Sequence, residues 1–191
     1  MAEQADKSID LCWYVGAYTG DGDKHKEDEY IKNGEWINGY KDRYLDIVNS
    51  VKVGDKIAIK SSYTQKNDLP FDLNGQTVSV MEIKAIGTVT ENIGDGRTLK
   101  VDWEKFEVPK KWYFYTGRTT IWKVERTENN ESANALLDFT FGNEEQDYNL
   151  FLNSNYWKNK YGVNSEGSKP TYVSEATAAL RSLGGTATMK E

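Results

Sequence analysis

Three segments of the sequence concentrate aromatic side chains, whose flat faces can stack on the bases of a nucleic acid. They are residues 11–18 (LCWYVGAY), 34–40 (GEWINGY) and 112–122 (WYFYTGRTTIW). Aromatic residues make up 13% of the chain, which includes 6 Trp and 12 Tyr. Stacking on an aromatic face stabilises a bound base by about 1–3 kcal/mol. Because aromatic rings also fill hydrophobic cores, each segment is a candidate either for a stacking pocket or for the core.

The sequence lacks the motifs of common enzyme classes. It has no Gly-rich phosphate loop, no dinucleotide-binding glycine turn and no nucleophile elbow. The single histidine, His25, lies among charged residues, and Cys12 lies between apolar ones, where a buried and inert thiol is favoured. We therefore predict a binding domain rather than an enzyme, and we expect no cofactor.

The sequence predicts neither a metal site nor a membrane-spanning segment. One cysteine and one histidine do not suffice for a zinc site of Cys and His ligands, and the loop Asp21-Gly22-Asp23 lacks the later acidic ligands of a calcium loop. No stretch approaches the roughly 20 apolar residues of a membrane span. Residues 1–10 have no apolar signal region, and a single cysteine forms no internal disulfide, so a cytoplasmic setting is expected.

Charge is distributed unevenly along the chain, whose formal net charge is −6. Residues 125–147 carry seven acids and one base, whereas residues 51–124 carry twelve bases and nine acids. The net charge argues against a broad, non-specific DNA binder. The basic middle of the chain permits a local patch of phosphate contacts, and an ordinary solvated surface remains the alternative.

The hydrophobic pattern predicts the elements that must position the aromatic segments. Short apolar or alternating runs predict β structure at residues 11–18, 56–62, 77–90, 98–106, 112–115 and 119–124. Helical spacing predicts helices at residues 27–33, 40–50, 130–141, 147–161 and 171–183. Gly87 is expected at a bulge or a sharp bend, and Val108-Pro109 is expected to end a strand.

Short strands with many turns, an early helix and a helical tail indicate an α+β protein built on a small barrel or half-barrel. We predict a disordered lead at residues 1–10 and a β-rich domain at residues 11–125. A helical extension at residues 126–163 is expected to pack on this domain, and residues 164–191 form a linker and tail.

The order of several short motifs resembles the EVE and YTH branch of the PUA-like superfamily. An aromatic strand, Trp13-Tyr14-Val15, is followed by Gly34-Glu35-Trp36, an amphipathic helix, the turn Val53-Gly54-Asp55 and a strand that ends in Ser61-Ser62. The later motif Leu99-Lys100-Val101-Asp102-Trp103 also fits this branch. The resemblance implies a twisted β pseudobarrel of about five or six strands, flanked by helices and followed by a helical C-terminal extension.

A closer resemblance is to the N-terminal domains of some McrB-type, GTP-driven restriction proteins, and it covers roughly residues 11–163. It rests on residues 39–46 (GYKDRYLD), 54–64 (GDKIAIKSSYT) and 112–116 (WYFYT), with Gln146-Asp147 and Tyr156-Trp157 in the tail. It implies a DNA-binding specificity domain that flips a modified, for instance methylated, base out of double-stranded DNA into an aromatic cage. The implied partners are a C-terminal NTPase motor and a nuclease subunit outside this chain.

The resemblance also implies candidate site residues. The Trp before the helix is a cage wall, which transfers to Trp36, and the end of the second strand places Ser61 and Ser62 at the pocket. In YTH domains a second cage Trp lies in the loop that corresponds to residues 91–97 (ENIGDGR), where this sequence has no aromatic side chain. The candidates to complete the cage are Tyr63, Trp112 and Phe114.

Polar residues around these segments are candidates for contacts with the base edge and the phosphates. Tyr18 and Thr19 are expected near the pocket rim, and the hydroxyls of Thr19, Ser61 and Ser62 can donate or accept at a base edge. The predicted phosphate contacts are Lys60, Lys66, Lys110, Lys111 and Arg118. Trp13, Trp103 and Trp122 are instead expected in the core.

Three other functions stay open at this point. The domain could read modified RNA instead of DNA. It could be a PUA-like hydrolase of a modified nucleoside, which requires a Lys–Glu or Thr–Lys–Glu set inside the pocket. It could also be a protein-interaction domain that contacts its partner through the acidic residues 125–147.

Overall fold

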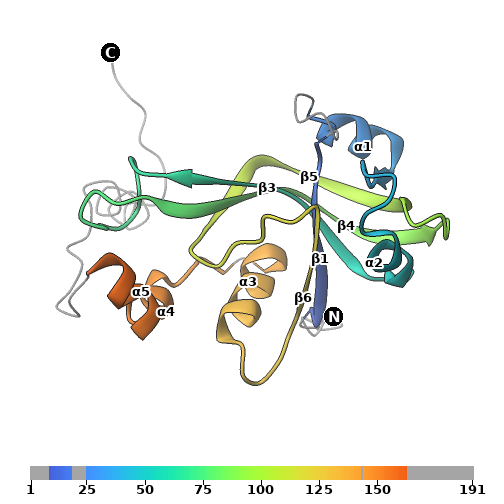
Figure 1. The fold of residues 1–191 in the computed structure, drawn as a ribbon. Coiled ribbons are helices and arrows are strands. Elements are labelled where there is room, and N and C mark those ends of the chain that lie inside the picture. Colours follow the sequence, from blue (N-terminus) through green and yellow to red (C-terminus); the bar gives the residue numbers. More distant parts are fainter. Residues whose placement is uncertain (1–8, 19–24, 143, 163–191) are drawn as a thin grey trace, which may run out of the picture. The chain divides into compact units, whose positions relative to one another are not determined.

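The computed structural model of the chain describes residues 9–18, 25–142 and 144–162 (Figure 1). Its strands are β1 (Leu11–Gly16), β2 (Glu35–Ile37), β3 (Lys56–Gln65), β4 (Val78–Asn92), β5 (Thr98–Tyr113) and β6 (Ile121–Glu125). The helices within these ranges are α1 (Glu27–Asn33), α2 (Leu45–Ser50), α3 (Glu131–Phe141), α4 (Tyr148–Leu152) and α5 (Asn155–Tyr161). The chain divides into two compact units, residues 1–63 with 79–146 and residues 64–78 with 147–191.

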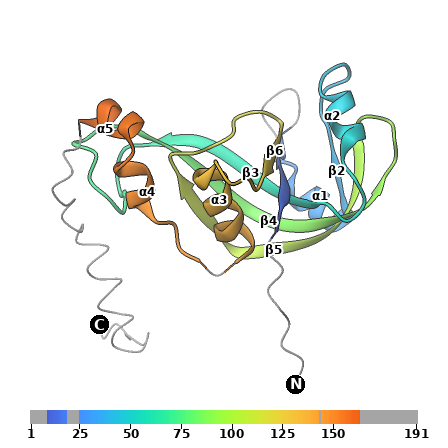
Figure 2. The ribbon, with the colours of Figure 1, turned by 90° about the horizontal axis from the view of Figure 1, so that it is seen from below.

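The strands form one mixed sheet in the order β2-β5-β4-β3-β1-β6, which is curled into a half-barrel (Figure 2). β1 pairs in parallel with β3 and antiparallel with β6. β5 pairs antiparallel with both β2 and β4. The connection between the parallel strands β1 and β3 carries α1, β2 and α2. The predicted α+β class with about six strands is therefore confirmed.

Both faces of β1 are covered, which explains its continuous run of apolar residues. Trp13 and Val15 belong to the hydrophobic core that the sheet shares with α1 and α2. Tyr14 alternates to the opposite face, where its hydroxyl oxygen lies 2.7 Å from the hydroxyl oxygen of Thr140 in α3. β1 is thus fixed from both sides, and this also fixes the position of Gly16 at its end.

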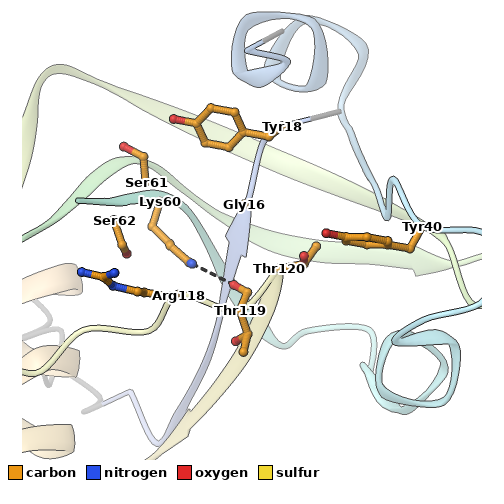
Figure 3. A pocket seen from close by; sticks show the side chains of 9 residues that line it. All are labelled: Gly16, Tyr18, Tyr40, Lys60, Ser61, Ser62, Arg118, Thr119 and Thr120. Atoms are coloured by element: carbon orange, nitrogen blue, oxygen red, sulfur yellow. Dashed lines mark hydrogen bonds between the residues drawn. The ribbon is translucent and has the colours of Figure 1, made fainter. Parts of the chain in front are cut away.

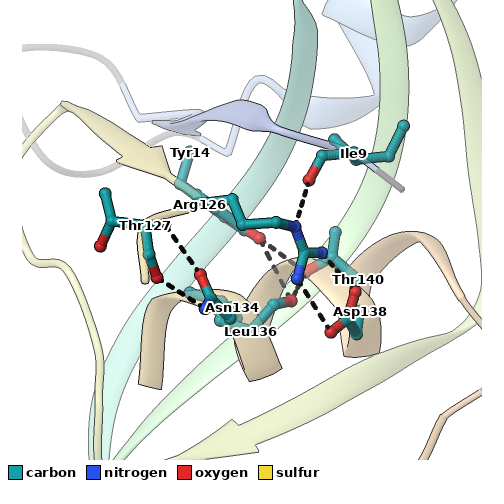
Figure 4. Close-up of polar contacts among 8 residues, drawn as sticks. All are labelled: Ile9, Tyr14, Arg126, Thr127, Asn134, Leu136, Asp138 and Thr140. Atoms are coloured by element: carbon teal, nitrogen blue, oxygen red, sulfur yellow. Dashed lines mark hydrogen bonds and ion pairs between the residues drawn. The ribbon is translucent and has the colours of Figure 1, made fainter. Parts of the chain in front are cut away.

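Polar contacts along α3 hold this helix beside the end of β6 (Figure 4). The Asn130 side chain caps the helix by accepting from the backbone N–H of Ala133. Asn134 exchanges two hydrogen bonds with the backbone of Thr127. Arg126, directly after β6, forms an ion pair with Asp138 one helical turn before the end of α3. The helix predicted at residues 130–141 is confirmed, with Asn130 as its cap.

Gly87 does not mark a bulge in β4, contrary to the prediction. It pairs regularly with Trp103 of β5, and the register shifts lie on either side, between Ile83 and Ala85 and between Val89 and Glu91. A Cβ atom at Gly87 would lie 2.6 Å from the Cγ1 atom of Val101. Glycine is therefore required here for the close approach of the β5 side chains.

Pro109 does not end the strand either, because β5 continues to Tyr113. The ladder between β4 and β5 passes from the pair Ile83–Lys110 directly to the pair Ala85–Lys105. The intervening β5 residues therefore form an irregular stretch in which a proline, which has no N–H, loses no ladder hydrogen bond.

The helix predicted at residues 40–50 is shorter than expected, since α2 begins only at Leu45. Tyr44 precedes it in the left-handed region, with φ 65°, and a regular helix cannot pass through that conformation. The four-residue spacing of Tyr40 and Tyr44 is typical of a helix. It instead reflects a turn in which the two rings meet edge to face, with centroids 5.7 Å apart.

In the second unit, the single helix predicted at residues 147–161 is two short helices, α4 and α5. Asp147 and Ser154 are the N-caps, and their side chains accept from the backbone N–H groups of Asn149 and Trp157. Two polar caps seven residues apart explain why one apolar period yields two helices. Within the same unit, the Tyr161 hydroxyl donates to the carbonyl of Thr77 over 3.2 Å.

Several expectations fall wholly or mostly outside the described residues: the lead at residues 1–10, of which only residues 9 and 10 are described, Thr19, and the linker and tail at residues 164–191 with the helix at residues 171–183. Within the ranges that the structure does describe, no helix is long and apolar enough to cross a membrane.

Candidate functional site

A pocket of about 150 Å³ lies at the end of β1, beside the middle of its parallel neighbour β3 (Figure 3). Four segments of the first unit supply its walls: the end of β1, the middle of β3, the residues between β2 and α2, and residues 114–120, here called the β5–β6 loop. The lining residues are Gly16, Tyr18, Tyr40, Lys60, Ser61, Ser62, Arg118, Thr119 and Thr120.

The pairing of β1 with β3 places the pocket. Gly16 lies opposite Lys60 in the parallel register, so the chain leaves β1 just where β3 presents Lys60, Ser61 and Ser62. Hydrogen bonds on both sides fix Gly16. Its N–H donates to the Thr120 carbonyl over 2.8 Å, and its carbonyl accepts from Nε1 of Trp36 over 2.8 Å.

The β5–β6 loop is fastened to β3 by side chains of the pocket. Lys60 Nζ donates to the carbonyls of Gly117 and Thr119, over 2.8 Å in each case, and Ser62 Oγ donates to Gly117 over 2.7 Å. A Cβ atom at Gly117 would lie 2.2 Å from Cε3 of Trp122, so only glycine lets the loop cross this ring. These contacts hold the neighbouring residue, Arg118, at the pocket.

Lys60 gives the pocket a buried positive charge. Its side chain is only 4% exposed, and this burial lowers its pKa to about 8. Two backbone carbonyls accept from its ammonium group, and no carboxylate stands among the lining residues that the structure describes. Together with Arg118, Lys60 makes the pocket suited to a group rich in hydrogen-bond acceptors.

Two tyrosine rings lie on different sides of the pocket (Figure 3). Tyr18 is 42% exposed, and its ring centroid lies 4.8 Å from that of His25, to which it is joined by a β-bridge. Tyr40 is half-buried, and the guanidinium carbon of Arg43 lies 5.5 Å from its ring centroid. Each ring lines the pocket and is held by a contact with a neighbouring side chain, which suits it to stack on a flat ligand.

Five of the residues predicted for the site come together in this pocket. Tyr18, Ser61 and Ser62 were predicted to contact the base, whereas Lys60 and Arg118 were predicted to contact phosphates; all five line it. Thr19 lies outside the described residues.

The structure does not bring the other predicted aromatic residues to the pocket. Trp36, Trp112 and Phe114 are buried in the protein interior. Trp36 is fully buried because it closes the core between β2 and β1, and its only polar atom is satisfied by the Gly16 carbonyl. The Tyr63 hydroxyl donates to Glu82 over 2.8 Å, and burial next to this carboxylate raises the pKa of Tyr63.

Three of the lysines predicted to bind phosphate do not line the pocket. Lys110 donates to the carbonyls of Phe139, Thr140 and Gly142 at the end of α3. Lys111 is exposed, with Nζ 3.9 Å from a carboxylate oxygen of Glu82. Lys66 is exposed in the second unit.

Four lining residues were not predicted from the sequence: Gly16, Tyr40, Thr119 and Thr120. Tyr40 belongs to an aromatic segment that was singled out, but its spacing to Tyr44 assigned it to a helix. For Thr119 and Thr120 the sequence carries no signal, because only the hydrogen bonds from Lys60 and Gly16 to their carbonyls bring the loop to β3.

The sequence matches no known protein-family model, and no curated protein is significantly similar to it. Among the described residues, no group of three or more His, Cys, Asp or Glu side chains is placed to hold a metal ion.

Proposed function

We propose that this chain binds nucleic acid and takes a single base into the pocket between the end of β1 and the middle of β3. One observation carries the proposal: two tyrosine rings, several hydroxyls and two cations from distant parts of the sequence meet around one cavity. The rings of Tyr18 and Tyr40 can stack on a base, the groups of β3 can bind its edge, and Arg118 can hold a phosphate.

The size and the energetics of the pocket support this proposal. A cavity of about 150 Å³ in another protein holds benzene, so the cavity volume here, about 150 Å³, suits one six-membered ring. Extruding a base from a duplex costs a few kcal/mol. Stacking stabilises the bound base by about 1–3 kcal/mol, and a hydrogen bond from a charged group such as Lys60 adds about 1.5–3 kcal/mol. These terms together offset the extrusion.

We further propose that the base is a modified base in double-stranded DNA, and that the chain is the specificity domain of a McrB-like, modification-dependent restriction system. Support comes from the order of the motifs at residues 39–46, 54–64 and 112–116. The curled half-barrel is compatible with the EVE- and YTH-like pseudobarrel that these motifs imply. In such a system the NTPase motor and the nuclease would belong to other segments or subunits, outside the residues of this chain.

Binding to matched duplexes tests the proposal. The duplexes carry one cytosine, 5-methylcytosine, 5-hydroxymethylcytosine, N6-methyladenine or 5-hydroxymethyluracil, so that the modified bases include both amino and oxo bases, and RNA strands with the corresponding bases are measured in parallel. We expect a preference for one modified DNA and a loss of about tenfold or more in affinity for Tyr40→Ala, because one stacking face is removed. Tyr156→Ala is the matched control, since Tyr156 is 66% exposed and does not line the pocket.

Each alternative gives a different result in this experiment. A preference for a modified RNA would replace DNA by RNA as the ligand. Conversion of a free modified nucleoside by the wild-type protein would favour the hydrolase instead. If no nucleic acid binds more tightly when modified, and Tyr40→Ala behaves like Tyr156→Ala, the proposed function is wrong.

A further inference from the structure

Lys60 has a hydrogen-bond donor that the described contacts do not use. An ammonium group has three N–H donors and no acceptor. Two of its donors go to the carbonyls of Gly117 and Thr119. Because the side chain is 4% exposed and yet lines the pocket, a group bound there is in the best position to accept from the third.

The hydroxyls next to this ammonium group have the opposite character. Ser62 Oγ donates its hydrogen to the Gly117 carbonyl, and Thr119 Oγ1 donates to the carbonyl of Ile121 over 3.0 Å. A hydroxyl whose hydrogen is engaged can still accept. Lys60, Ser62 and Thr119 therefore present a charged donor and two acceptors, which is the complement of an oxo group beside an N–H, while the hydroxyls of Ser61 and Thr120 can turn to donate or to accept.

We infer that Lys60 selects bases that carry an oxo group at the edge entering the pocket, such as uracil, thymine, guanine or hypoxanthine, over bases with an amino group there. This inference rests on the proposed function and narrows it: among modified bases, one with an oxo group at that edge, such as 5-hydroxymethyluracil, is expected to bind more tightly than 5-methylcytosine, 5-hydroxymethylcytosine or N6-methyladenine. The exocyclic substituent is the outermost atom of a base edge, so it reaches Lys60 first. An oxo group accepts from the ammonium group, whereas an amino group directs its own hydrogens toward it.

The expected selectivity follows from the charge and burial of Lys60. A hydrogen bond to a charged group contributes about 1.5–3 kcal/mol, and each 1.4 kcal/mol corresponds to a tenfold change in affinity. An amino group at the same place forfeits this bond and leaves a buried charge without a third partner. We therefore expect the oxo base to bind at least about tenfold more tightly.

Duplexes with one test base opposite an abasic site measure this preference, because a base without a partner is extruded at the lowest cost. Deoxyuridine is compared with deoxycytidine, and deoxyinosine with deoxyadenosine, so that ring size stays constant within each pair. We expect wild-type protein to prefer deoxyuridine and deoxyinosine, each by about tenfold. Lys60→Met, which keeps the length of the side chain without its charge, is expected to abolish both preferences.

Two further variants separate selection of the base from support of the β5–β6 loop. Lys60→Arg retains a charged donor and should retain the preference. Ser62→Ala removes a different bond between β3 and Gly117, so it loosens the loop while the ammonium group stays. We expect lower affinity for both members of each pair, and a preference that is smaller than in the wild-type protein, because one acceptor is lost, but that persists with the ammonium group. Thermal unfolding of every variant establishes that it is folded.

The pH profile gives an independent readout. The pKa of Lys60 is about 8, so its charge, and with it the preference, is expected to fall several-fold as the pH rises from about 7 to 9. The other titratable groups that line the pocket are Tyr18 from the β1 end, Tyr40 from the segment before α2, and Arg118 from the β5–β6 loop. Lys60→Met retains all three, so any pH dependence that its ratio shows, for instance from ionisation of the N–H groups of the oxo bases, is compared with that of the wild-type protein, and the difference is the contribution of Lys60.

The possible failures are distinguishable. If none of the duplexes binds and Tyr40→Ala changes nothing, the proposed function fails. If the duplexes bind through Tyr40 but the amino bases bind as tightly as the oxo bases, or if Lys60→Met keeps the preference, only the role of Lys60 is overturned.

Discussion

At the scale of single residues, Trp36 is a core residue that supports the pocket through Gly16. It is fully buried, and its Nε1 donates to the carbonyl of Gly16, which lines the pocket. A tryptophan that acts as a cage wall must present a ring face to the ligand, and a fully buried side chain does not. Residue type alone could not separate these roles, because a core tryptophan and a stacking tryptophan are equally aromatic.

We expect substitutions of Trp36 to lower stability before they affect recognition. Trp36→Ala should lower the free energy of unfolding by about 3–5 kcal/mol, since it leaves a large cavity. Trp36→Phe fills most of the volume but leaves the Gly16 carbonyl without its donor, so about 1–3 kcal/mol is expected. Urea unfolding followed by circular dichroism measures both values.

The opposite result, a loss of binding without a loss of stability, would mean that Trp36 contacts the bound base. In that case Trp36→Phe would unfold like the wild-type protein but would bind the preferred duplex much more weakly. Tyr156→Ala again serves as the control, because an exposed tyrosine is expected to change the free energy of unfolding by no more than about 0.5 kcal/mol.

At the scale of secondary-structure elements, the elements with a regular hydrophobic pattern could be predicted from the sequence. Boundaries that depend on a single residue or contact could not. The positions of β1, α1 and α3 follow from their apolar patterns and caps. The early end of the α2 pattern depends on one left-handed residue, Tyr44, and the continuation of β5 through Pro109 depends on an irregular register. Neither feature has a period, so a pattern search cannot find it. The same holds for the β5–β6 loop, which Lys60 fixes.

Lys110 was predicted to contact phosphate, but in the structure it binds the end of α3. Its ammonium group donates to three carbonyls at the C-terminus of α3, and its charge also complements the helix dipole there. We expect Lys110→Met to lower the free energy of unfolding by about 1–2 kcal/mol. It should leave the affinity for nucleic acid unchanged. Urea unfolding and a binding titration check the two statements.

Lys111→Met is the matched control for this prediction. Lys111 is the next residue of β5 and is exposed. Its Nζ lies as far as 3.9 Å from a Glu82 oxygen, so this surface ion pair is weak, and Lys111→Met should lower the free energy of unfolding by less than about 0.5 kcal/mol. Equal effects of the two variants on stability, or a loss of binding with Lys110→Met alone, would contradict the assignment of Lys110 to α3.

At the scale of the whole molecule, the charge that the sequence places in residues 51–124 is largely compensated within the fold. Ion pairs join Lys84 to Glu27, Lys100 to Glu35 and Lys105 to Asp28. The excess of bases over acids in this region therefore does not translate into a broad basic surface. With a formal net charge of −6, recognition must depend on the pocket more than on attraction to the phosphate backbone.

This balance predicts a weak dependence of binding on salt. Each neutralised phosphate contributes about −0.9 to the slope of log K against log salt. If Arg118 and one or two neighbours contact phosphates, the slope for duplex DNA should be about −2 to −3, and Arg118→Met should make it less negative by about one. Titrations between about 50 and 200 mM salt measure these slopes, with Lys111→Met as the control that leaves the slope unchanged. A slope of about −6 or steeper would mean a wide electrostatic interface, and the affinity would then come from the duplex backbone and not from the extruded base.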